Sequence, residues 1–170
     1  GLSGPVGATL ESFVNVWQER NGEPNIPITA ALVDGQVREL SHRLEKDAAV
    51  IPLDISTVEG MRTYKRSLTM VLVAAAQRLF PNTHITIDHS ITANGYYCET
   101  EGRPPLSPQE VTTLEREMRQ LVQADLPLSR QVVSLGEATA MFARQGYDDK
   151  VRLLRFHRMP TVELCELAGA

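Results

Sequence analysis

Three features that would direct a functional assignment are missing from this sequence: an excess of basic residues, a disulfide framework and a long hydrophobic run. Its 17 Lys and Arg residues stand against 21 Asp and Glu residues, which gives a net charge of −4. That balance argues against strong, sequence-independent binding to nucleic acid, although it leaves room for a local basic patch. The two cysteines, Cys98 and Cys165, are too few for a disulfide framework, so we expect reduced thiols.

Membrane, secretory and common cofactor signatures are also missing. The longest apolar run, residues 70–76, is too short for a membrane span, and the chain does not start with a secretory signal. The motifs GxxxxGK[ST], GxGxxG, GxSxG, HExxH and CxxC do not occur. We therefore expect a cytoplasmic protein with no membrane partner, and no metal or cofactor held by these motifs.

The composition that is present, 42% hydrophobic and 22% charged residues, is typical of a globular protein. In the first third, Thr9 is a good N-cap for a helix that ends near Arg20. Asp34-Gly35 lies between two β-rich runs and predicts a tight hairpin turn, and residues 50–55 predict a further strand. These elements predict a small α+β unit over residues 1–56.

The rest of the chain predicts a long helix from Thr57 to Leu79 and then a pair of strands within residues 84–100. Two capping boxes, Ser107 with Glu110 and Ser134 with Glu137, predict the starts of two more helices. Strands are expected at residues 128–134, 151–157 and 161–167. The fold class is therefore α+β, with helices that interrupt an antiparallel sheet.

Five side chains are candidates for a functional site. His89 follows Asp88 at the end of an expected strand, where functional residues are common, whereas His84 and His89 are expected on opposite strand faces. Cys165 and Glu163 are expected to share a strand face, although a buried cysteine with a packing role is the favoured interpretation. Lys150, at the start of an expected strand, and Arg66, on the long helix, can equally be solvated surface residues.

Residues 26–54 (IPITAALVDGQVRELSHRLEKDAAVIPLD) resemble the later part of a TGS domain, the ubiquitin-like module at the front of threonyl-tRNA synthetases. Residues 60–81, 85–99 and 106–146 resemble the second additional domain of those synthetases, which hydrolyses mischarged tRNA. The resemblance implies a small ubiquitin-like α/β-roll unit over residues 1–56, without its first hairpin. An antiparallel-sheet, editing-like domain would follow over residues 57–170, with a long connecting helix and a truncated C-terminal end.

The four signature positions of that editing domain are mostly replaced. The resemblance places the histidines of its HxxxH motif at Met70 and Ala74, and the residues of its CxxxH motif at Cys165 and Gly169. Only the cysteine is retained. A metal or hydrolytic site of that design is therefore not expected, because Met and Ala cannot ligate a metal or transfer a proton as histidine does.

The segments TYKRSL, HSITANGYYCE and DDKVRLLRFHR also resemble the corresponding region of bacterial nucleoside kinases of the uridine kinase type. That resemblance implies a non-catalytic, regulatory or ligand-binding region that precedes a kinase domain. The parent would use ATP and Mg²⁺, and the region itself would hold no cofactor but could take a nucleoside or another small ligand. The expected cleft residues are Lys150, Glu163 and Cys165, with His89 and Arg66 as further candidates. The alternative is an aminoacyl-tRNA editing hydrolase or a tRNA-binding domain related to threonyl-tRNA synthetase, with tRNA as the less favoured partner.

Overall fold

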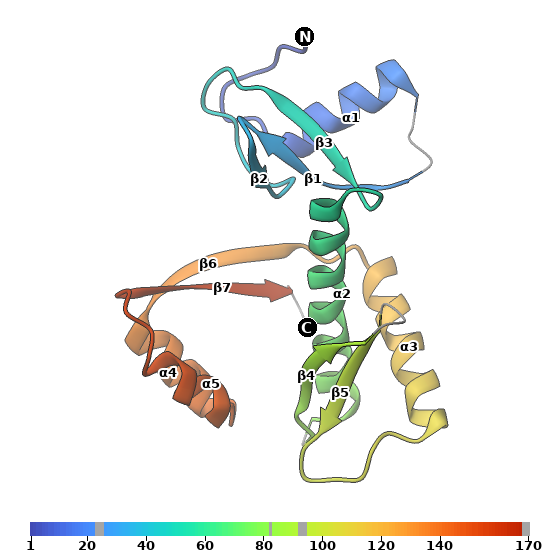
Figure 1. The fold of residues 1–170 in the computed structure, drawn as a ribbon, viewed down its shortest axis with the longest axis vertical. Coiled ribbons are helices and arrows are strands. Elements are labelled where there is room, and N and C mark those ends of the chain that lie inside the picture. Colours follow the sequence, from blue (N-terminus) through green and yellow to red (C-terminus); the bar gives the residue numbers. More distant parts are fainter. Residues whose placement is uncertain (23–25, 82, 92–94, 168–170) are drawn as a thin grey trace. The chain divides into compact units, whose positions relative to one another are not determined.

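The computed structural model describes residues 1–22, 26–81, 83–91 and 95–167, and its elements follow one another in mixed α and β order (Figure 1). The α+β class is therefore confirmed. Contacts divide the chain into two units, Gly1–Met70 and Val71–Ala170, and helix α2, Val58–Leu79, runs from the first unit into the second. The interpretation of residues 1–56 and 57–170 as separate domains stays a prediction.

The first unit pairs one helix with a three-stranded antiparallel sheet. Helix α1, Leu10–Asn21, begins after Thr9, whose hydroxyl accepts a hydrogen bond from the Ser12 N–H. The strands are β1, Ile28–Val33, β2, Gln36–Arg38, and β3, Val50–Asp54, in the order β2-β1-β3. The predicted hairpin turn is confirmed: Asp34 and Gly35 have φ angles of 49° and 80°.

The core of this unit forms where α1 and the sheet bury their apolar side chains, namely Leu10, Val14, Ala30, Ala31 and Leu53. The start of α2 lies very close to the end of β3. A Cβ atom on Gly60 would lie 1.9 Å from the Asp54 carbonyl oxygen, so only glycine fits there. The Thr29 hydroxyl donates a hydrogen bond of 3.1 Å to the Gly60 carbonyl, which fastens β1 to α2.

The second unit is built around the later turns of α2. Strands β4, Ile85–Ser90, and β5, Tyr96–Thr100, form the predicted antiparallel pair, although its turn at residues 92–94 lies outside the described residues. Helix α3, Pro108–Gln123, packs its apolar face on α2. The core consists of residues from α2, α3 and the last strand: Val71, Ala74, Ala75, Ala76, Leu114, Leu121 and Leu167.

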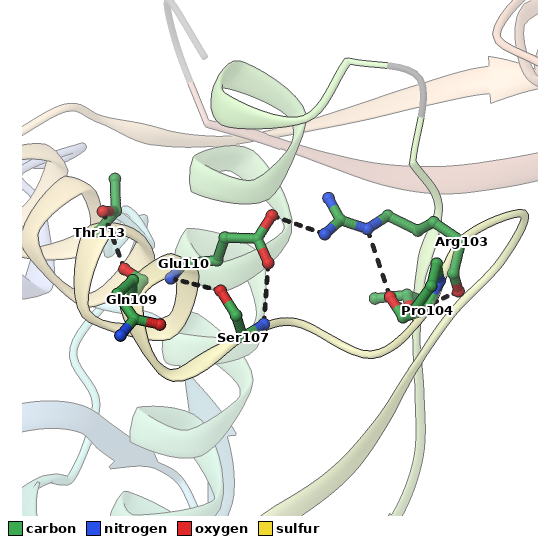
Figure 2. Close-up of polar contacts among 7 residues, drawn as sticks. Arg103, Pro104, Ser107, Gln109, Glu110 and Thr113 are labelled. Atoms are coloured by element: carbon green, nitrogen blue, oxygen red, sulfur yellow. Dashed lines mark hydrogen bonds and ion pairs between the residues drawn. The ribbon is translucent and has the colours of Figure 1, made fainter.

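The predicted capping box at the start of α3 is confirmed (Figure 2). The Ser107 hydroxyl accepts from the Glu110 N–H, while the Glu110 carboxylate accepts from the Ser107 N–H at 2.8 Å. The Arg103 guanidinium also binds this carboxylate, at 2.6 Å. These contacts lower the pKa of Glu110 to about 2. The Arg103 guanidinium lowers it most, and the Ser107 N–H and hydroxyl follow.

A second part of this unit is an antiparallel ribbon of β6, Leu128–Ser134, and β7, Thr161–Leu167, joined through helices α4, Leu135–Arg144, and α5, Asp148–Leu154 (Figure 1). The second capping box, Ser134 with Glu137, is confirmed at the start of α4. Leu167 lies in the core beside α2 and α3, so it anchors the end of the ribbon to the rest of the unit.

The strand expected at residues 151–157 is wrong, because most of this segment belongs to α5 and the turn after it. Val151 and Leu154 are half-buried and three residues apart, which is helical spacing. Asp148 and Asp149 lie in the first turn, where negative charge stabilises a helix. Within the described residues, the β structure forms three separate antiparallel sheets of three, two and two strands rather than one interrupted sheet.

Candidate functional site

Lys150 lies between two aromatic rings. Its ammonium nitrogen is 4.0 Å from the centroid of the Tyr147 ring and 5.1 Å from that of Phe142. Both distances suit cation–π attraction. Burial lowers the pKa of Lys150, and the nearby Asp149 carboxylate opposes that shift only in part. Lys150 is thus a half-buried amine that gives up its proton more readily than a lysine in water.

Tyr147 connects this lysine to elements that are distant in the sequence. Its ring meets that of His84 edge to face, with centroids 4.8 Å apart, and its hydroxyl oxygen accepts a hydrogen bond from the Gln77 side-chain amide. Gly146, with a φ angle of 78°, turns the chain between α4 and α5, and places Tyr147 beside His84. We call Gln77, His84, Phe142, Tyr147 and Lys150 the Lys150 cluster.

Glu163 and Cys165 lie on the ribbon. The Glu163 carboxylate forms an ion pair with Arg130 at 3.0 Å, and Arg130 stands opposite Cys165 in the strand register. Cys165 is exposed, so the expectation of a buried packing cysteine is wrong. Glu163 and Cys165 are both exposed on alternate positions of β7, so they share the face that carries Arg130. Among the described residues, no hydrogen bond or ion pair links this group to Lys150.

The two remaining candidates lie elsewhere. His89 pairs with Tyr97 beside an irregularity in the β4–β5 register, and its side chain lies outside the description. Arg66 is an exposed residue of α2 within the first unit. Ala74, where the resemblance places a signature histidine, is buried in the core beside Ala75. Gly169, the position of another signature histidine, lies outside the described residues.

Gln77, His84 and Tyr147 were not identified from the sequence. Tyr147 and Lys150 are three residues apart, which would have paired them on a helix, but the segment was interpreted as a strand. Their contact with His84 and Gln77 depends on the tertiary fold, for which the sequence offers no local signal.

No helix in the described part of the chain is long and apolar enough to cross a membrane. Over the same residues, no three His, Cys, Asp or Glu side chains gather to form a metal site. In the first unit a pocket of about 580 Å³ lies beside α1, with Phe13 and Trp17 among its lining residues and Lys46 and Asp47 as its charged ones.

The segment from Arg144 to Arg158 carries a local excess of positive charge. It holds five basic residues, Arg144, Lys150, Arg152, Arg155 and Arg158, against the two acidic residues Asp148 and Asp149, a net charge of +3 in a chain of net charge −4. The four arginines are exposed. This is the local basic patch that the overall composition left room for.

Comparison with known proteins relates this chain to aminoacyl-tRNA ligases. In particular, its homologues are threonine–tRNA ligases. The chain is 37% identical to that of Symbiobacterium thermophilum over 125 residues, which is 74% of this chain and 19% of the relative. It is 31% identical to that of Hahella chejuensis over 134 residues (79% and 21%), and 30% identical to that of Nitratidesulfovibrio vulgaris over 154 residues (91% and 22%).

The chain spans about one fifth of the length of the curated relatives it matches. No family model matches the sequence. The relatives support the resemblance to the TGS and editing-like region of threonyl-tRNA synthetases.

The hypothesis that this region belongs to a nucleoside kinase is wrong, because the homologues are threonine–tRNA ligases. The comparisons likewise give no support to a downstream kinase domain as partner. They favour the alternative, a region related to threonyl-tRNA synthetase.

Proposed function

We propose that this chain is a tRNA-binding region of a protein related to threonine–tRNA ligase, and that its second unit contacts the RNA. The observation that carries the proposal is the basic segment of residues 144–158, with a net charge of +3. The similarity to threonine–tRNA ligases supports the choice of tRNA, because those relatives are named for a reaction on that molecule.

Exposed arginines are suited to this role because a guanidinium binds phosphate oxygens through two parallel hydrogen bonds. Arg152, Arg155 and Arg158 lie at intervals of three residues at the end of α5 and in the turn that follows. Each phosphate contact releases bound counterions, so binding should weaken steeply as salt rises. The acidic remainder of the chain would repel RNA and restrict it to this segment.

The test is filter binding of a threonine tRNA transcript to the 170-residue chain over a range of salt concentrations. We expect log K to fall linearly with log salt, and Arg155→Gln to lower the slope by about 1. Arg116→Gln on α3 is the matched control, because it removes one exposed arginine outside the basic segment. No binding at physiological ionic strength, or equal effects of the two variants, would contradict the proposal.

A second candidate function is hydrolysis of mischarged tRNA, and one observation favours it. Lys150, whose pKa is lowered, stands over the ring of Tyr147, and Tyr147 in turn contacts His84, so three groups able to transfer protons are linked through Tyr147. Deacylation of a mischarged threonine tRNA, lost in Lys150→Ala and retained in Arg116→Gln, would support hydrolysis. A first-order rate equal to that without protein would reject it and leave tRNA binding as the function.

A further inference from the structure

A triplet pattern occupies the end of α5 and the turn after it. Three arginines are each followed by an apolar residue, in the pairs Arg152-Leu153, Arg155-Phe156 and Arg158-Met159. The apolar members are unusually exposed: Leu153 is 69%, Phe156 82% and Met159 63% accessible. Apolar side chains of this size are normally covered, so three exposed ones at intervals of three residues indicate a contact surface.

The backbone aligns the first members of this pattern. Three consecutive hydrogen bonds connect residues three apart: Arg155 N–H to Arg152 O at 3.3 Å, Phe156 N–H to Leu153 O at 3.1 Å, and His157 N–H to Leu154 O at 3.1 Å. This bonding is that of a 3₁₀ turn, in which side chains at positions i and i+3 lie above one another. Arg152 and Arg155 therefore form one row, and Leu153 and Phe156 form a second row next to it.

Two contacts hold the turn in place while its exposed side chains face water. The His157 imidazole Nε2 lies 2.9 Å from the Thr161 carbonyl oxygen, at the start of β7. The Pro160 carbonyl accepts a hydrogen bond of 2.9 Å from the Leu135 N–H, at the start of α4. Because the backbone is already fixed, a ligand that binds here loses less of its binding energy to ordering the protein.

We infer that the Arg152–Met159 strip binds an unpaired RNA strand, an inference that rests on the proposed tRNA binding and names the part of the RNA involved. Successive phosphates of a single strand can pair with the row of guanidinium groups. The exposed faces of unstacked bases can cover Leu153, Phe156 and Met159, as bases do on aromatic side chains in single-strand binding proteins. Paired RNA supplies the phosphates but keeps its bases stacked inside the helix, so it leaves the apolar row uncovered.

The experiment measures fluorescence anisotropy of two labelled RNAs, an unstructured 12-nucleotide pyrimidine strand and a fully paired hairpin of similar charge. We expect Phe156→Ala to weaken binding of the single strand about five-fold or more and binding of the hairpin less than two-fold. Val122→Ala on α3, where Val122 is 58% exposed, is the matched control and should leave both unchanged. Because Phe156 is so exposed, Phe156→Ala should unfold at the same temperature as the original chain.

The tRNA transcript separates this inference from the proposed function. If the chain binds tRNA but Phe156→Ala leaves binding of the tRNA and of the single strand unchanged, the strip is not a single-strand site and tRNA binding stands. If neither RNA binds, both are overturned. Vesicles of neutral and anionic phospholipid provide the last arm. Binding to them that needs Phe156, without binding to the single strand, would assign the strip to a membrane surface and overturn the inference.

Discussion

The ammonium of Lys150 lies over the face of Tyr147, 4.0 Å from the ring centroid. Burial lowers the pKa of Lys150 and so disfavours the charged amine, whereas the Asp149 carboxylate and the contact with the ring favour it. Tyr147 is in turn held by His84 and Gln77, so the position of the lysine depends on three separate segments of the second unit. The pH dependence of stability should report this balance.

Lys150→Met should remove a pH-dependent destabilisation. A lysine whose pKa is lower in the folded than in the unfolded chain binds fewer protons when folded, so its unfavourable effect is complete below the folded pKa. The effect is relieved as pH rises toward the ordinary lysine value of about 10.4. The original chain should therefore gain stability relative to Lys150→Met between pH 7 and pH 10. Urea unfolding followed by circular dichroism measures the difference, and a constant difference would contradict the expectation.

The fold was predictable where local chemistry decides it. Two helix starts and one turn are determined by residues that are near neighbours in the sequence, and the structure confirms all three. They are Ser107 with Glu110, Ser134 with Glu137, and Asp34-Gly35. The α5 segment was not predictable, because its apolar residues, Val151, Leu153 and Leu154, form a run too short to distinguish a helix from a strand.

The Lys150 cluster could not be derived from the sequence for a different reason. His84 and Tyr147 are 63 positions apart, and only the tertiary fold, which sets Tyr147 against His84 and Gln77, brings them together. Cys165 and Glu163 were correctly placed on one strand, but the exposure of Cys165 depends on what covers the ribbon, which no local pattern reports.

Glu110→Gln should destabilise the second unit at neutral pH and have little effect in acid. Its pKa of about 2 lies below the ordinary value of 4.5, so the stabilisation by the carboxylate is present above 4.5 and lost as pH falls toward 2. Glutamine preserves the capping box while it removes the charge that Arg103 binds. Urea unfolding at pH 6 and pH 2.5 checks this.

Glu115→Gln is the matched control for that measurement. Its partner Arg119 is one helical turn away, and both side chains are well exposed, at 60% and 73% respectively, so the pair should contribute little. Equal losses at pH 6 for Glu110→Gln and Glu115→Gln would show that the Arg103 contact adds nothing.

Two glycine-to-alanine changes should shift the free energy of unfolding in opposite directions. Gly60→Ala places a Cβ atom 1.9 Å from the Asp54 carbonyl oxygen, and the backbone shift this requires should cost roughly 1–3 kcal/mol. Gly136→Ala, within α4, meets nothing within 4 Å and should stabilise by about 0.5–1 kcal/mol through helix propensity. The fluorescence of Trp17 reports unfolding of the first unit for Gly60→Ala, and circular dichroism reports on Gly136→Ala.

The two thiols should differ in reactivity. Cys98 is an exposed residue, yet partial burial of its sulfur raises the pKa of the thiol and so reduces the reactive thiolate near neutral pH. Cys165 is exposed on β7 of the ribbon, so a reagent can reach its sulfur. A Cys98→Ser chain, which retains only Cys165, should therefore react faster with a disulfide reagent at pH 7.5 than a Cys165→Ser chain. Equal rates for the two chains would contradict the expectation.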